Sequence, residues 1–285
     1  MINKLNNKFL YTILYLVSLI NLSLLNLFAK FLSNFSFLYR KAIVQNNITN
    51  AFPKSSDKQI NVIVKKFYFY FFRMFFETIK MISADKSFYN KRIKFTNPEL
   101  LEKYKKENKS VILMLGHHNN WEWSGHIISL LSKQQFICVY KKFSSKFFNN
   151  LMIKLRSKFG IKLVEMNDII RFLYNDKSCK IIGLISDQNP NINTTKHWTS
   201  FFNQTVPVID GGDKIARKMN YPVLYVNMTM IKSGYYNLTL EVLEENPSIT
   251  QYGEIADKFI KRLEKKIIEE PNSYLWSHNR WKHKK

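Results

Sequence analysis

Beyond residue 110 the chain alternates between short apolar runs and segments of helical periodicity, and this alternation constrains the fold more than any other feature. Short apolar runs suit buried strands, whereas a four-residue apolar spacing suits helices that cover a sheet. The expected strands are Val111–Leu115, Phe136–Tyr140, Lys180–Ser186, Pro222–Met230 and Tyr236–Val242. Helices are expected after Asn120 and Phe147, over Asp213–Met219 and over Glu254–Glu270. Alternating strands and helices predict an α/β fold in which helices flank a sheet.

The amino-terminal segment carries 20 residues without a formal charge, from Phe9 to Phe28, with lysines on both sides. Such a run is long enough to cross the core of a bilayer as a helix. Asn21 and Asn26 weaken it as a span, so a helix lying in the membrane interface is the alternative. We expect a membrane anchor over residues 1–35 and one folded domain over residues 36–285.

A second apolar stretch runs from Val62 to Phe76 and is rich in aromatic residues. On a helical wheel, Lys65, Lys66 and Arg73 fall on one side of it, which predicts a helix with one solvated edge. Two interpretations stay open. The helix packs in the core, or it lies at a bilayer surface or lines a groove for an acyl chain.

The charge balance points to anionic partners. The chain has 44 Lys and Arg against 21 Asp and Glu, a formal charge of +23, which suits nucleic acid, anionic lipid headgroups or an acidic carrier protein. The content of 23 Phe and 15 Tyr favours a membrane partner. The basic tail Trp276–Lys285 admits a nucleic-acid interpretation, but no nucleic-acid-binding motif accompanies it. Cys138 and Cys179 stand apart, so we expect neither a disulfide framework nor a zinc site.

Residues 111–125, VILMLGHHNNWEWSG, bring an apolar strand into a polar corner and then a helix. Asn119 or Asn120 is the expected N-cap, and with Asn119 in that role Glu122 would complete a variant capping box. On one continuous helix His117 and Glu122 would point about 140° apart. They can meet only if His117 lies in the turn before the helix. There the carboxylate would fix the imidazole tautomer while His117 deprotonates a substrate alcohol, and the helix start would favour an anionic intermediate.

The other candidate residues have simpler explanations that stay open. A metal site at His117, His118 and Glu122 is not expected, because the spacing differs from HExxH and no remote ligands accompany it. Asp187 and Gln188 follow a strand and precede a proline, so an Asx turn would explain them without a function. For Arg156, a solvent-exposed cation on a helix is the alternative to a binding role.

The pattern of Gly116, His117, four residues and Glu122 resembles the catalytic motif of the glycerolipid acyltransferase superfamily. The form GHHNNWEW is similar to that of the bacterial lipid A biosynthesis (lauroyl/myristoyl) acyltransferase family. Four later segments resemble further blocks of that family, in the same order. They are Tyr140–Gly160 with Arg156 in the basic position, SDQNP at Ser186–Pro190, the segment 201–223 and the segment 275–285.

The resemblance implies a mixed sheet flanked by helices, with an acyltransferase domain over residues 36–285 behind the anchor over residues 1–35. It implies His117 as general base with Glu122 as its partner; His118 is set aside because only His117 has the motif's distance to Glu122. Substrate binding or site organisation is implied for Arg156, Asp187 and Gln188.

The implied reaction moves an acyl chain from acyl carrier protein, or from acyl-CoA, to a hydroxyl of a lipid A precursor. It needs no cofactor and no metal, and it takes place on the cytoplasmic face of the bacterial inner membrane, in contact with its lipids and without nucleic acid. The alternatives are a lysophospholipid or aminolipid acceptor, or a non-catalytic basic protein that binds membranes or nucleic acid.

Overall fold

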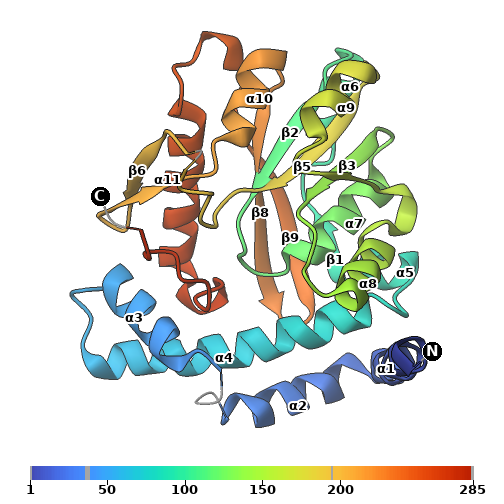
Figure 1. Ribbon diagram of the computed structural model, residues 1–285, viewed down its shortest axis with the longest axis vertical. Coiled ribbons are helices and arrows are strands. Elements are labelled where there is room, and N and C mark those ends of the chain that lie inside the picture. Colours follow the sequence, from blue (N-terminus) through green and yellow to red (C-terminus); the bar gives the residue numbers. More distant parts are fainter. Residues whose placement is uncertain (1, 36–38, 194, 284–285) are drawn as a thin grey trace.

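The computed structural model describes residues 2–35, 39–193 and 195–283, and its centre is a seven-stranded sheet (Figure 1). The strand order is β1-β9-β8-β2-β5-β3-β4; β8 and β9 pair antiparallel and the other neighbours pair parallel. The strands of this sheet are β1 Ile93–Phe95, β2 Val111–Leu115, β3 Gln135–Tyr140, β4 Lys162–Glu165, β5 Lys180–Ile185, β8 Val223–Lys232 and β9 Tyr235–Glu244. A separate hairpin joins β6 Trp198–Phe201 to β7 Gln204–Pro207. The prediction of an α/β fold with a mixed sheet is confirmed.

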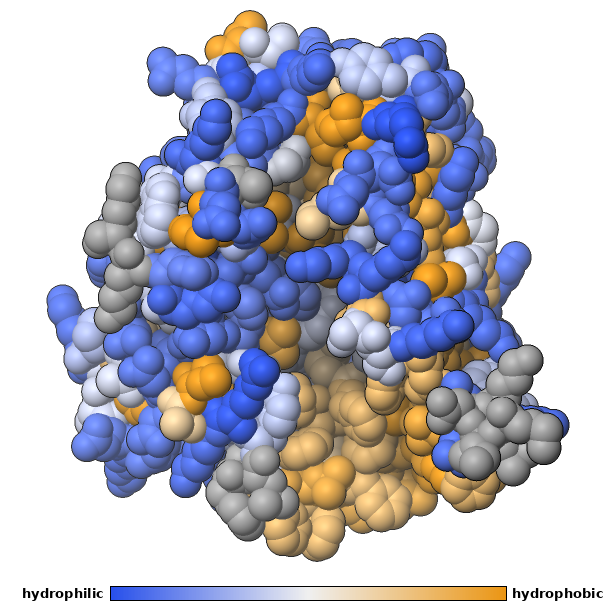
Figure 2. All heavy atoms as spheres, in the orientation of Figure 1, coloured by the Kyte–Doolittle hydropathy of each residue, from blue (hydrophilic) through white to orange (hydrophobic). Residues whose placement is uncertain are grey.

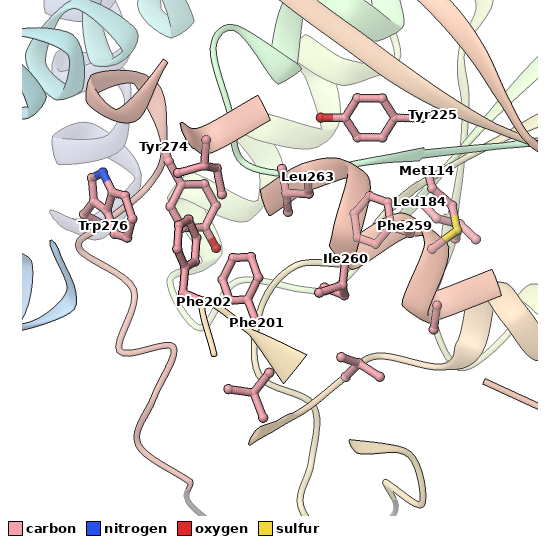
Figure 3. Close-up of a cluster of buried hydrophobic side chains, with 14 of the residues drawn as sticks. Met114, Leu184, Phe201, Phe202, Tyr225, Phe259, Ile260, Leu263, Tyr274 and Trp276 are labelled. Atoms are coloured by element: carbon pink, nitrogen blue, oxygen red, sulfur yellow. The ribbon is translucent and has the colours of Figure 1, made fainter. Parts of the chain in front are cut away.

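Helices cover both faces of the sheet because its central strands are apolar on both sides. The helices are α1 Ile2–Leu19, α2 Leu22–Ser33, α3 Lys41–Ala51, α4 Asp57–Lys80, α5 Lys86–Arg92, α6 Glu99–Lys106, α7 Trp121–Leu131, α8 Lys146–Arg156, α9 Ile169–Asn175, α10 Gly211–Met219 and α11 Glu254–Glu269. In β2, Ile112 and Met114 face the core formed with α9, α10 and α11, part of which Figure 3 shows. Leu113 and Leu115 face the opposite core, formed with α6, α7 and α8.

All five predicted strands are present, with ends that differ by at most two residues. The strands not foreseen are β1 and β4 at the sheet edges and the hairpin pair β6 and β7. The two edge strands have three and four residues, too few to show a period-two pattern in the sequence.

The amino-terminal segment departs from the single helix predicted over 9–28. It forms α1 and α2, bent by 112° at Ile20 and Asn21. The break has a local cause, because the Asn21 side chain caps α2 by accepting a hydrogen bond from the Ser23 backbone N–H at 2.8 Å. Among the described helices, none by itself is long and apolar enough to cross a membrane, and only this bent pair passes on combined length and composition.

Helix α4 starts at a capping box between Ser56 and Gln59 and lies across the sheet at the end where β8 stops (Figure 1). Lys65 and Lys66 are exposed as predicted, but Arg73 is not part of a solvated edge. Arg73 is 2% exposed and lies 3.5 Å from Glu77, which is fully buried. The sequence pattern failed here because a buried carboxylate one turn along the helix compensates the guanidinium charge.

The carboxyl-terminal segment is also more buried than its composition indicates. After a 3-10 turn at Pro271–Ser273 the chain packs Trp276 and Trp281 into the core, and even Arg280 is only 1% exposed. Asn47 of α3 donates to the carbonyl oxygens of Trp276 and His278, both at 2.7 Å. This part of the tail is therefore a structural element and not a solvated basic patch.

Candidate active site

The candidate site lies where the parallel neighbours β2 and β5 end, with Leu115 paired to Ile185 in the register. The chain leaves both strands at the same edge of the sheet, so the loops 116–120 and 186–189 meet there. Carboxyl ends of neighbouring strands are the usual location of sites in α/β folds, because the loops are exposed while the strands hold them rigidly.

His117 pairs with Asp187 at this edge. The imidazole Nδ1 lies 2.7 Å from Asp187 Oδ1, and the His117 backbone N–H donates to Asp187 Oδ2 at 2.9 Å. Since a carboxylate only accepts hydrogen bonds, Nδ1 carries the proton and Nε2 keeps its lone pair. The His117 side chain is 17% exposed and that of Asp187 only 2%. Asp187 therefore fixes the orientation and tautomer of a histidine whose side chain keeps some exposure.

The Asp187 carboxyl stays ionised despite its burial. Burial by itself raises its pKa, but the charge of His117 and the two hydrogen bonds from that residue outweigh it and lower the pKa. The carboxylate can accordingly stabilise an imidazolium when His117 accepts a proton.

Glu122 is not the hydrogen-bond partner of His117, contrary to the predicted pair. Its two oxygens accept a bidentate pair from Arg156, at 2.9 Å from Nε and 2.5 Å from Nη2. Burial raises the pKa of Glu122, and the Arg156 charge and hydrogen bonds reverse this and lower it overall. The capping-box variant also fails, because the N-cap is Asn120, whose side chain accepts from Trp123 N–H at 3.0 Å. Glu122 then occupies the second helical position and turns toward α8.

Trp121 joins the two pairs. Its indole N–H donates to Glu122 at 3.2 Å, and its ring meets the His117 ring edge-on with 4.9 Å between centroids. Glu122 and Arg156 thus reach the histidine through a packed indole. Trp121 was not among the residues predicted from the sequence. The available signal was its position at the start of the helix that follows His117.

Gln188 faces the nitrogen of His117 that Asp187 leaves free. Its side-chain amide lies 3.3 Å from His117 Nε2. The next residue, Asn189, is tied to the carboxyl-terminal segment: its N–H donates to His278 Nε2 at 3.1 Å and its Oδ1 accepts from Arg280 at 2.9 Å. The segment therefore forms one wall of the site.

His118 has a different environment from its neighbour. It is 4% exposed, and its Nε2 lies 3.1 Å from the Glu270 carbonyl oxygen. Burial lowers its pKa to about 4, only partly opposed by Glu270. His118 is a neutral structural residue near pH 7, which supports the choice of His117 as the reactive histidine.

The model of the bacterial lipid A biosynthesis acyltransferase family matches residues 4–283. The chain belongs to this family. No curated protein matches the sequence. Membership makes the chain an acyltransferase and implies a lipid A precursor and an acyl donor as substrates.

An apolar pocket of about 60 Å³ begins beside the site of this lipid A family acyltransferase, between α7 and the sheet. Trp121, Glu122 and Arg156 line it, so it reaches the indole that packs on His117. It runs inward from Val139 to Phe136, three residues or about 10 Å along β3. The remaining lining is mainly apolar and comes from β2, β5, α7 and β8.

Phe136, near the start of β3, lines this pocket. Its ring lies between two glycines: a Cβ added at Gly183 would come 2.8 Å from the ring, and one at Gly125 would come 3.4 Å from it. The two glycines leave the space that the ring fills.

A buried polar network that includes Tyr70 and Glu77 of α4 supports the loop 116–120 from the other side. Glu77 accepts from Asn120 at 2.5 Å and from Tyr236 at 2.6 Å, and Tyr70 donates to the Asn119 carbonyl at 2.9 Å. Sequence reasoning missed Glu77. A single acid within an aromatic run, four residues after Arg73, was the signal available.

Proposed function

We propose that this acyltransferase transfers a fatty acyl chain from an acyl carrier protein thioester to a hydroxyl of a lipid A precursor, with His117 as the general base. The observation that carries the proposal is the His117–Asp187 pair, which leaves the Nε2 lone pair on the side away from Asp187, while the His117 ring packs on Trp121, a residue that lines an apolar pocket. Asp187 takes the orienting role that the sequence motif gave to Glu122. Glu122 and Arg156 hold Trp121 and the pocket wall.

The reaction follows from the protonation state. The acceptor hydroxyl takes the position of the Gln188 amide opposite Nε2 and gives its proton to His117 as its oxygen attacks the thioester carbonyl. A C–O bond forms, the C–S bond breaks, and the imidazolium returns the proton to the leaving thiolate. Asp187 stabilises the imidazolium, and the start of α7 favours the negative oxygen of the intermediate. The step uses protein groups and the two substrates, without a cofactor or metal.

The apolar pocket supplies the acyl site in this scheme. A hydrocarbon chain that enters past Trp121 replaces water along β3 and α7, and each buried methylene favours binding by about 0.8 kcal/mol. Phe136 would then limit the chain length.

The partners follow from charge and location. Lys141, on the loop between β3 and α8, and Lys146, at the start of α8, are exposed and suit an acidic carrier protein or lipid phosphates. We place the enzyme on the cytoplasmic face of the bacterial inner membrane, where carrier-protein thioesters are available. Its membrane association, typical of the family, relies on residues 1–35 as the anchor of the domain over residues 36–285.

The test is transfer of a radiolabelled acyl chain by purified enzyme. Donors are thioesters of acyl carrier protein and of CoA; acceptors are a tetra-acylated lipid A precursor and a lysophospholipid. His117→Ala should abolish transfer to the lipid A precursor, while the control His197→Ala, which removes a histidine paired with Asp257 away from the site, should retain it. Transfer to lysophospholipid alone would reassign the acceptor, and transfer that survives His117→Ala would reject the general base.

A further inference from the structure

Helix α2 carries large apolar side chains on its outward side as well as on the side that contacts the protein. Leu22, Leu25 and Ala29 are buried, and the helix is part of the core on the α7 side of the sheet. The outward side is formed by large apolar residues at helical spacing: Leu24, Leu27, Phe28 and Phe31. Leu27 is 63% exposed and Phe31 59%. A contiguous exposed surface of large apolar side chains marks a contact with lipid or with another protein.

Helix α1 continues the same exposed surface. Its outward side chains are Phe9, Leu10, Ile13, Leu16 and Leu19, whereas Leu14 and Val17 pack on the body. We call the exposed apolar side chains of α1 and α2 the apolar base. Figure 2 shows apolar side chains gathered along this lower end of the molecule, and polar ones over most of the remaining face.

The bend between the two helices is held by α4 and the turn after it. Lys80 Nζ donates to the carbonyl oxygens of Ser18 at 2.6 Å and Ile20 at 3.0 Å, and Ser83 Oγ donates to Ser18 at 2.7 Å. The ammonium thus stabilises the carboxyl end of α1, where the helix dipole is negative. Straightening the pair would break these bonds and expose Leu22 and Leu25.

The lengths of α1 and α2 also favour a position in the surface layer of a bilayer. Helix α1 has 18 residues and α2 has 12, so at 1.5 Å per residue they are about 27 and 18 Å long. The hydrocarbon core of a bilayer is about 30 Å thick. Docked along one side on the protein body, the two helices fit the surface layer of a bilayer better than its full depth.

Charge indicates which lipids suit this surface. Residues 1–56 contain six Lys and Arg and no Asp or Glu. Lys8 on α1, Lys30 on α2, and Lys65 and Lys66 on α4 are exposed around the helices. Cations at the edge of an apolar surface match anionic headgroups, each contributing about 1 kcal/mol near such a membrane.

We propose that α1 and α2 lie in the plane of a single leaflet that contains anionic phospholipids, with the apolar base among the acyl chains, and that neither helix crosses the bilayer. Helix α4 lies between α2 and the loop 116–120, since α2 packs on α4 while Tyr70 and Glu77 of α4 contact that loop. The site is therefore about one helix diameter, roughly 10 Å, above the lipid. The inference does not depend on the acyl transfer reaction, because location and binding are measured without turnover.

The first experiment locates α1 by cysteine labelling of the full chain, after replacement of Cys138 and Cys179 by alanine. Single cysteines replace Asn7 on α1, Asn34 after α2, and Lys106 on α6 as the reference for the body; all three positions are exposed. A membrane-impermeant maleimide is added to sealed vesicles of each orientation. We expect Asn7→Cys and Asn34→Cys to react from the same side as Lys106→Cys. Reaction of Asn7→Cys from the opposite side alone would overturn the proposal.

The second experiment measures binding to phosphatidylethanolamine vesicles containing phosphatidylglycerol, by flotation. Leu27→Asp and Phe31→Asp should each weaken binding about ten-fold or more, because an apolar side chain leaves the acyl layer. The matched control is Ile249→Asp, at a residue 82% exposed outside the apolar base, and it should bind like the wild type. Equal binding by Leu27→Asp and the control would reject the apolar base as the lipid contact. Thermal unfolding of each variant shows that it is folded.

Discussion

Replacement of Asp187 by asparagine tests the assignment of the orienting carboxylate most directly. Asp187 accepts two hydrogen bonds, from Nδ1–H and from the backbone N–H of His117. The two bonds go to different carboxylate oxygens, and in asparagine one of those two positions becomes an NH₂ group that cannot accept. If the amide oxygen keeps the backbone N–H, the NH₂ group faces Nδ1 and stabilises the tautomer with the proton on Nε2, which cannot act as a base. The opposite orientation places NH₂ against the backbone N–H, at a cost of about 1–3 kcal/mol for an unsatisfied buried donor.

We therefore expect Asp187→Asn to lower kcat by about 10³-fold, or roughly 4 kcal/mol of transition-state stabilisation. Glu122→Gln provides the contrast. It removes the charge that compensates the Arg156 guanidinium, so its main effect should be a loss of about 3 kcal/mol in the free energy of unfolding. The assays are single-turnover acyl transfer and denaturant unfolding in detergent. Two results together would refute this assignment: Asp187→Asn keeps its activity within about threefold of wild type, and Glu122→Gln loses about 10³-fold in activity with unchanged stability.

The contribution of Asp187 to the stability of the folded protein depends on pH. The folded-state pKa of Asp187 is lowered, so the stability that its ionised form contributes is present above the unfolded value of 3.8 and is lost as pH falls through the folded value below it. Asp187 does not titrate between pH 5 and 9. An acidic limb of kcat in that range must therefore belong to another group.

Three further outcomes are expected. His118→Ala should lower the melting temperature but leave measurable transfer, whereas His117→Ala should abolish transfer in enzyme that thermal unfolding shows to be folded; the reverse pattern of transfer would exchange the two roles. Phe136→Ala should relax discrimination against longer acyl chains, about ten-fold or more per methylene, in competition assays with carrier-protein thioesters of different length; unchanged selectivity would place the acyl chain elsewhere. His118 and His126 have pKa values lowered by burial from 6.5 to about 4, so the unfolded chain binds protons first as pH falls. The free energy of unfolding should then drop by about 2 kcal/mol per histidine between pH 6.5 and 5, and a flat profile in denaturant titrations would contradict their buried neutral state.

The sequence by itself determined the five central strands of the sheet, the helices predicted after residue 110 and the place of His117 between a strand and a helix. The strand Val111–Leu115, the turn that follows it and the helix after Asn120 follow from local rules, namely an apolar run, a polar corner and an amide N-cap. The motif also led to the family, because its blocks keep their order along the chain. These features depend on neighbours within a few residues, so a linear pattern records them.

The tertiary structure decided which groups meet. Asp187 is 70 residues from His117, and they meet because β2 and β5 pair in the register of Leu115 with Ile185. The expected partner, Glu122, was diverted to Arg156, since a bidentate ion pair with α8 satisfies both of its oxygens once they are buried.

The bend at Asn21 and the buried tail also depend on distant contacts. Lys80 holds the end of α1 from 60 residues away, and Asn47 holds the tail across 229 residues. Such contacts form only when the whole sheet and its helices are in place. The Asn21 cap is local, but the distant contacts that hold the bend, and those that make the basic tail one wall of the site, leave no pattern along the chain.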